Sequence, residues 1–310
     1  MSAGDRTLLP DGVETSFAGI ESAMARLASA EGRYVAAARS LVPTATATVV
    51  AIGPCDRLVD AAAALKEHAE TGGIRAILIA SGERATPRVR VTATEIALEG
   101  LRARFINNAV AALRLPSLPM LVWWRGSDPS HAERVARLAD RFVLDAEDPG
   151  PLWARIETLI EEAAVTDLRW TGLTRWRALM AHFFDLPGVH EAVAQFSRLH
   201  VSGSDLPSAR LFAGWLVASV KWRQGPVQIE RRPGAPLDTV AWGNGRQELL
   251  LRRLPGRPCI EGRARLGGRE ASRIASLGNH TLTTLIAEEL RVRSRDAAFE
   301  AAVRAAGAIS

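Results

Sequence analysis

The chain contains little cysteine, tyrosine and lysine. Its 310 residues include 2 cysteines and 1 tyrosine, against 8 tryptophans. Cys55 and Cys259 are too few and too far apart for a disulfide framework, and neither lies in a CxxC or Cys/His cluster with metal-ligand spacing. We therefore expect no metal site and a reducing, cytoplasmic environment.

Long apolar runs are also missing. No segment reaches the length of a membrane-spanning helix. The N-terminal region carries Asp5, Asp11, Glu14 and Glu21 and has no continuous apolar core, so it does not resemble a secretory signal. We expect a soluble protein with no membrane partner.

The positive charge is carried almost entirely by arginine. The chain has 39 basic and 34 acidic residues, for a net charge of +5, and only Lys66 and Lys221 are lysine. Such a bias, alongside abundant Ala, Gly and Pro, is what a GC-rich genome produces by codon usage. Because the arginines alternate with acids, as they do over residues 133–145, they are typical of solvated helix faces rather than a nucleic-acid surface. We expect no nucleic-acid partner.

The first half of the sequence alternates short apolar strands with helices. The patterns predict strands over 44–53, 74–82, 88–96, 120–126 and 141–146, and helices over 21–40, 57–70, 101–113, 130–140 and 151–164. Asp56 is the expected cap of the second helix. We predict an α/β fold: a helical lead-in over 1–40, then a Rossmann-like domain with a mostly parallel sheet over 41–165.

The second half of the sequence has a different pattern of strands and helices. Strand patterns with one polar face lie at 227–231, 248–254 and 259–266, and helical stripes at 206–222 and 281–292 frame them. Gly243-Asn244-Gly245 and Gly267-Gly268 indicate hairpins. We predict an α+β domain with an antiparallel sheet over 166–310, beginning with a Trp/Arg-rich helical connection.

Catalytic motifs are not found. The first strand-to-helix turn reads AIGPCDRL, with one glycine and then Pro54, which has no amide proton to offer a pyrophosphate, where a dinucleotide fingerprint needs several glycines. No GxxxxGK[ST], GxSxG or HExxH motif occurs, and the 6 histidines are scattered. We expect no catalytic residue, no cofactor and no enzymatic activity.

Tryptophan and arginine instead gather in two short motifs. The first contains Trp123, Trp124, Arg125 and Gly126, and the second contains Trp170, Thr171, Thr174, Arg175, Trp176 and Arg177. One interpretation is packing, because Trp buries a large area. The other is a binding site, in which the alternation of a strand points one of the two adjacent tryptophans outward beside Arg125.

These motifs carry a resemblance to a known family. LPSLPMLVWWRGSDP, then ADRFVLDAED, then DLRWTGLTRWRALMAHFFD resembles the signature of the OpcA family, the glucose-6-phosphate dehydrogenase assembly proteins of cyanobacteria and actinobacteria. SARLFAGWLVASVKW also fits, so the resemblance covers about residues 110 to 222. Gly172 and Met180 depart from the family pattern, in which Arg and Leu are usual.

The resemblance implies a non-catalytic role. A member of this family is expected to bind glucose-6-phosphate dehydrogenase, to promote its assembly or activate it allosterically, and so to support the oxidative pentose phosphate pathway. The motif residues are then partner-binding or structural. The alternative is a sugar-phosphate or nucleotide sensor in which Arg125, Arg175 and Arg177 clamp a phosphate.

Overall fold

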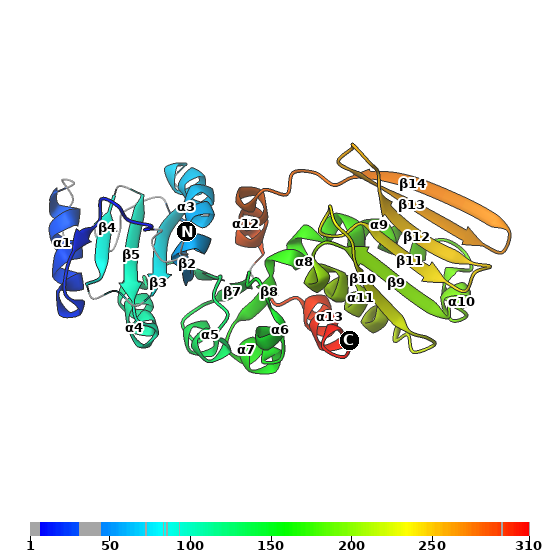
Figure 1. Ribbon diagram of the computed structural model, residues 1–310, viewed down its shortest axis with the longest axis horizontal. Helices are drawn as coiled ribbons and strands as arrows, with labels where there is room; N and C mark the ends of the chain where they lie inside the picture. The colour runs from blue at the N-terminus through cyan, green and yellow to red at the C-terminus, as the bar shows by residue number, and fades with distance from the viewer. Residues whose placement is uncertain are drawn as a thin grey trace. The chain divides into compact units, whose positions relative to one another are not determined.

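The computed structural model describes residues 7–30, 45–71, 73–82, 84, 86–92, 94–292 and 294–309 (Figure 1). The chain divides into two compact units. Unit 1 comprises Met1–Asp167 with Thr281–Arg295, and unit 2 comprises Leu168–His280 with Asp296–Ser310. The second half of the helix predicted over 21–40 lies outside the described residues.

Unit 1 is built on an eight-stranded sheet with the order β1-β4-β5-β3-β2-β6-β7-β8. Its strands are β1 (Val13–Glu14), β2 (Ala47–Pro54), β3 (Ile74–Ser81), β4 (Arg88–Val91), β5 (Glu95–Leu101), β6 (Met120–Trp124), β7 (Arg141–Leu144) and β8 (Ala164–Asp167). All neighbours are parallel except β4, which runs antiparallel to both β1 and β5. The predicted α/β class is confirmed.

Helices cover both faces of this sheet, which explains why the central strands are apolar throughout. They are η1 (Phe17–Gly19), α1 (Ile20–Ala30), α3 (Cys55–Glu70), α4 (Ala103–Leu113), α5 (Pro129–Ala136), α6 (Gly150–Trp153), α7 (Ile156–Glu162) and α12 (Leu282–Arg291). The prediction that Asp56 caps α3 is wrong. Pro54 holds that position, and Asp56 lies in the first turn, where a carboxylate is favoured by the helix dipole.

The strand predicted over 88–96 is in fact two strands, because the chain reverses at Thr92. The Thr92 hydroxyl accepts hydrogen bonds from the backbone N–H groups of Thr94 at 3.4 Å and Glu95 at 3.2 Å. Such a hydroxyl-stabilised turn interrupts an otherwise continuous alternating pattern. β4 therefore forms a hairpin with β5 at one side of the sheet.

Unit 2 is built on a six-stranded sheet with the order β10-β9-β11-β12-β13-β14. Its strands are β9 (Arg198–Gly203), β10 (Val227–Arg231), β11 (Thr239–Gly243), β12 (Glu248–Arg253), β13 (Cys259–Leu266) and β14 (Arg269–Ser276). The hairpins predicted at residues 243–245 and 267–268 are confirmed. β10 was predicted to be antiparallel but lies parallel to β9, because a helix crosses over between them.

That crossover is α11 (Leu206–Val220), and the other helices of unit 2 are α8 (Leu168–Gly172), α9 (Thr174–Phe184), α10 (Val189–Val193) and α13 (Ala297–Ala306). α11 packs closely on α13, since a Cβ atom added at Gly214 would lie 2.4 Å from the Ala302 carbonyl oxygen. α9 packs against β12, β13 and β14. The sheet is thus covered by helices on one face.

The helix predicted over 281–292 does not frame the second sheet. It is α12, which packs against α3 within unit 1. The buried Arg141 side chain holds it there, with Nε donating to Glu289 Oε2 at 2.7 Å and Nη1 donating to the Ser294 carbonyl oxygen at 3.3 Å. A helical stripe in the sequence reveals an apolar face but not the sheet on which that face packs.

Candidate functional site

The first motif lies at the carboxyl end of β6, in the centre of the unit 1 sheet. The strand that follows β2 in the chain, β3, lies on one side of β2, and β6 lies on the other side. The order in which strands are added to the sheet therefore reverses between β2 and β6. The Arg125 N–H donates to the Ile52 carbonyl oxygen at 2.7 Å, which holds the end of β6 against β2. Ligands of open α/β sheets bind at such a point.

Both tryptophans of this motif are buried, so the prediction that one faces outward is wrong. The exposed fraction is 0% for Trp123 and 3% for Trp124. Strand alternation does point the two rings to opposite faces, but helices cover each face. Trp123 Nε1 donates to Asp145 Oδ2 at 3.0 Å, and the Trp124 ring stacks on Phe142 with centroids 6.0 Å apart.

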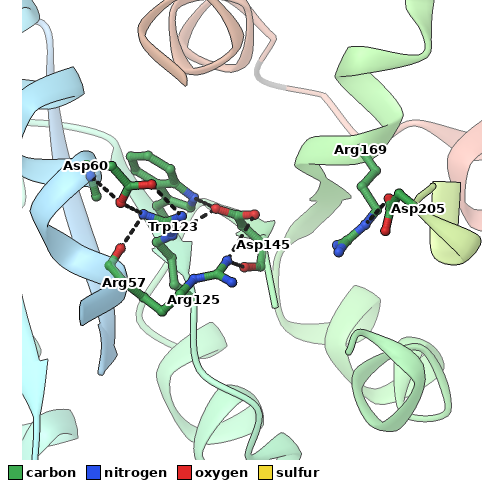
Figure 2. A network of polar contacts seen from close by, with 8 residues as sticks. Arg57, Asp60, Trp123, Arg125, Asp145, Arg169 and Asp205 are labelled. Atoms are coloured by element: carbon green, nitrogen blue, oxygen red, sulfur yellow. Dashed lines mark hydrogen bonds and ion pairs between the residues drawn. The ribbon is translucent and has the colours of Figure 1, made fainter. Parts of the chain in front are cut away.

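Arg125 is the centre of a closed polar network (Figure 2). Its Nε lies 2.9 Å from Asp145 Oδ2, and its Nη2 donates to Asp60 Oδ2 at 3.2 Å. Nη1 contacts Asp60 Oδ1 and donates to the Arg57 carbonyl oxygen. Its guanidinium carbon lies 4.9 Å from the centroid of the Trp123 ring, and only 4% of its side chain is exposed. The charge of Arg125 is therefore neutralised inside the protein.

Two glycines allow the backbone to approach this network closely. A Cβ atom on Gly53 would lie 2.9 Å from Arg125 Cβ, and one on Gly126 would lie 3.0 Å from Trp124 Cζ2. A side chain at either position would displace a motif residue. Gly126 of the predicted site thus has a packing role beside Trp124.

A cleft of about 320 Å³ lies beside the network, at the carboxyl ends of β2, β3 and β6. Its charged lining residues besides Arg125 are Arg57, Asp128, His131, Glu147 and Asp148. Asp128 caps α5 by accepting from Ser130 N at 2.8 Å, and its Oδ2 lies 3.0 Å from His131 Nδ1. The cleft is therefore rich in carboxylates, and Pro54 offers no N–H there, so its donors suit a phosphate poorly.

The second motif connects the first helices of unit 2 to two later ones. Trp170 is buried, and its Nε1 donates to Asp296 Oδ2 at 2.8 Å, while Asp296 Oδ1 accepts from Phe299 N at 3.0 Å and so caps α13. The preceding Arg169 donates from Nε to Asp205 Oδ2 at 2.9 Å (Figure 2). Asp205 caps α11. The motif therefore fixes the N-terminal ends of α11 and α13.

Arg177 is held against Trp170. Its guanidinium carbon lies 3.5 Å from the centroid of the Trp170 ring, and Nη2 donates to the Trp170 carbonyl oxygen at 3.2 Å. Burial lowers the pKa of Arg177 to about 10, partly offset by the charge of Asp296, so the side chain is still protonated at neutral pH. Thr174 Oγ1 donates to the Thr171 carbonyl oxygen at 2.7 Å. Trp176, like Thr171, is buried.

Thr174 and Arg175 are the exposed members of the second motif. Arg175 lines a groove of about 410 Å³ between α9 and β14, together with His182 and Arg273. The sequence motifs did not include His182 or Arg273, nor the acidic partners of Arg125. Of these, Asp145 lies in the family-like ADRFVLDAED segment and His182 in the family-like DLRWTGLTRWRALMAHFFD segment, whereas Asp60 and Arg273 have no signal in the sequence.

Two further findings bear on what the sites can do. Among the described residues, no group of three or more His, Cys, Asp or Glu side chains is placed to hold a metal ion. In the same part of the chain, no helix combines the length and apolar character needed to cross a bilayer.

Comparison with protein families gives a match to the C-terminal domain of the glucose-6-phosphate dehydrogenase subunit family, OpcA, over residues 163–303. Among curated proteins, the OxPP cycle protein OpcA of Nostoc punctiforme is 28% identical over 150 residues, 45% of this chain and 32% of that protein. The OxPP cycle protein OpcA of Synechocystis is 28% identical over 138 residues, 42% of this chain and 29% of that protein. The matched segment thus spans about a third of each relative.

Solved structures show the fold. A 3-ketoreductase from Actinomadura kijaniata, in complex with NADP and TDP-benzene, has a TM-score of 0.51 and 11% identity, covering 84% of this chain and 94% of that chain. An aldose-aldose oxidoreductase from Caulobacter crescentus, complexed with glycerol, has a TM-score of 0.50 and 9% identity over the same shares. At this identity the likeness shows a Rossmann-like α/β fold and nothing of the chemistry.

Proposed function

We propose that this chain is a non-catalytic assembly factor and allosteric activator of glucose-6-phosphate dehydrogenase. It would thereby support the oxidative pentose phosphate pathway. The proposal follows from the match of residues 163–303 to the OpcA family, which the sequence predicted. The observation that carries the proposal is the position of the match, which covers the second Trp/Arg motif and all of the unit 2 sheet. Unit 2 is then the part of the chain that contacts the dehydrogenase.

The contacts of the motif arginines favour this role over a phosphate sensor. Arg125 is paired with Asp60 and Asp145, and Arg177 is stacked on Trp170. To clamp a phosphate, Arg125 would have to leave two carboxylates and Arg177 would have to leave the Trp170 ring, so each side chain would lose contacts that it already makes. Arg175 alone of the three is exposed.

An activator must bind the active form of its partner more tightly than the inactive form. A tenfold preference corresponds to about 1.4 kcal/mol, which a single well-placed side chain can supply. A rigid surface transmits such a preference best, since less of the contact energy is lost in ordering it. The caps on α11 and α13 provide this rigidity within unit 2.

The test is copurification of the full chain with the dehydrogenase of the same organism, followed by an activity assay of the dehydrogenase with and without the chain. We expect a complex and a higher rate, and we expect no effect from a heat-denatured sample of the same chain. Failure to form a complex, together with an unchanged rate, would overturn the proposal.

A further inference from the structure

The groove between α9 and β14 is open along an unpaired strand edge. β14 is the last strand of the sheet and pairs with β13 alone, so its outer N–H and C=O groups have no strand partner within the described sheet. Arg273 faces α9, because its register partner Gly262 lies under Phe183 of that helix, where a Cβ atom would be 2.4 Å from the Phe183 ring. Ile274 points to the other face and is 60% exposed.

The rim of this groove is positively charged without compensation. Arg175 comes from α9 and Arg273 from β14, and both are exposed. Arg273 Nη1 donates to His182 Nε2 at 2.9 Å, a contact that leaves its charge unpaired. None of the residues that line the groove is acidic.

Three other arginines in or next to the same sheet are paired with glutamates. Arg252 Nε donates to Glu261 Oε2 at 2.6 Å, and Arg263 Nε donates to Glu261 Oε1 at 3.0 Å. Arg232 Nε donates to Glu230 Oε1 at 2.9 Å. These three guanidinium groups are held by carboxylates of the chain itself, whereas those of Arg175 and Arg273 have no acidic side chain among the residues that line their groove.

The apolar part of the groove lining is formed by Ala178 and Leu179 of α9 and by Ala275 of β14, and two of these three side chains are small. Small side chains let another backbone come close to a strand edge, which is the geometry of strand addition. A guanidinium fork at the rim then pairs with a carboxylate through two hydrogen bonds.

We infer that this groove docks an extended, acidic segment of the partner enzyme, which lies along β14 and places carboxylates on Arg175 and Arg273. The inference rests on the proposed function and adds to it a contact surface and the chemistry of the contact. The unpaired edge favours a polypeptide over a small anion, because only a polypeptide backbone can pair with the N–H and C=O groups of an edge strand.

The experiment measures the dissociation constant between the purified full chain and the purified dehydrogenase by calorimetry. The variants are Arg175→Glu, Arg273→Glu and the double variant, and the matched control is Arg246→Glu, an exposed arginine in the turn between β11 and β12. We expect each single reversal to weaken binding at least about tenfold, the double reversal about 100-fold, and the control less than about twofold. Melting temperatures should be unchanged, because all three side chains are exposed.

Each other outcome overturns a defined part of the inference. If the wild type binds and the double variant binds equally well, the docking groove is wrong while the proposed function stands. If the wild type does not bind, both are wrong. If glucose 6-phosphate alone binds the wild type but not the double variant, and dehydrogenase binding is unchanged, the groove is a small-anion site and the docking inference is overturned.

Discussion

The two Trp/Arg motifs use the same residue types to different ends. In unit 1, Arg125 follows a central strand and is enclosed by Asp60 and Asp145, with 4% of its side chain exposed. In unit 2, Arg177 is stacked on Trp170 while its near neighbour Arg175 is exposed on the same helix. The first motif is buried except for Gly126, which is partly exposed, and the second has a buried part and an exposed part.

The difference follows from the secondary structure that carries each motif. A strand covered by helices on both faces has no solvent side, so every polar group at its end needs a partner within the protein. A helix that packs one face on a sheet keeps another face in water. On α9, Trp176 therefore lies in the core while the adjacent Arg175 is displayed. Of the two motifs, the helical one therefore presents the exposed side chains.

The largest expected effect comes from removing Arg125. Arg125→Ala removes the nearer of two cations beside Asp145, whose side chain is 15% exposed, and leaves Arg57 Nη2 at 3.7 Å. We expect a loss of about 2–4 kcal/mol in the free energy of unfolding, measured by urea denaturation. The matched control is Arg232→Ala, which breaks a pair with Glu230 in which both side chains are nearly half exposed, and it should lower the free energy of unfolding far less. Equal losses in the two variants would show that the network is no stronger than a surface pair.

A smaller effect is expected at Gly53, which touches the same network through the backbone. In Gly53→Ala the new Cβ atom would lie 2.9 Å from Arg125 Cβ, so one of the two strands must shift. We expect a loss of about 1–3 kcal/mol by urea denaturation. Gly172→Ala is the control, since no atom lies within 4 Å of its added Cβ. A neutral Gly53→Ala would mean that the end of β6 is loosely held.

The smallest effect concerns acid stability, which we expect to depend on unit 1. Glu99 is buried, which by itself raises its pKa, but hydrogen bonds from Thr7, Leu9 N and Cys55 and the charge of Arg84 together lower it below the ordinary range. At a pH between the folded and the unfolded pKa of Glu99, the unfolded chain therefore binds a proton at this carboxyl group that the folded chain does not bind. The resulting stabilisation is present above the unfolded pKa of Glu99 and is lost as the pH falls through the folded one.

Glu99→Gln should accordingly flatten the decline of the urea midpoint between neutral and acidic pH. Glu230→Gln in unit 2 is the control, because its pKa is also lowered, by hydrogen bonds with Arg232 and His200, but its side chain is 46% exposed and screened by solvent. A control curve as flat as that of Glu99→Gln would place the acid sensitivity in the exposed pairs instead.

The sequence predicts those features that depend on local patterns. The strand of residues 120–124 follows from its apolar run, and the hairpins of unit 2 follow from Gly243-Asn244-Gly245 and Gly267-Gly268, where Gly245 and Gly267 adopt φ of 85° and 53°. The family-like segments likewise predicted Arg125 and Arg175 as motif residues.

The rest depends on contacts between distant segments. Asp60 reaches Arg125 only because β2 and β6 are neighbours and α3 begins beside them, which is a matter of topology. β14 reads REASRIAS, which does not alternate, so nothing marked Arg273 as the neighbour of α9. Of the two interpretations of the adjacent tryptophans, packing holds for both rings, and the choice could not be made from alternation, which does not tell whether a helix covers a face of the strand.

The most direct test of the central claim is the dissociation constant of the organism's own glucose-6-phosphate dehydrogenase for the wild-type chain and for Arg175→Ala, with the melting temperature taken on the same samples. The account predicts saturable binding by the wild type, binding weakened at least about fivefold by Arg175→Ala, and equal melting temperatures. Equal dissociation constants for the two chains, or no binding by the wild type, would contradict it.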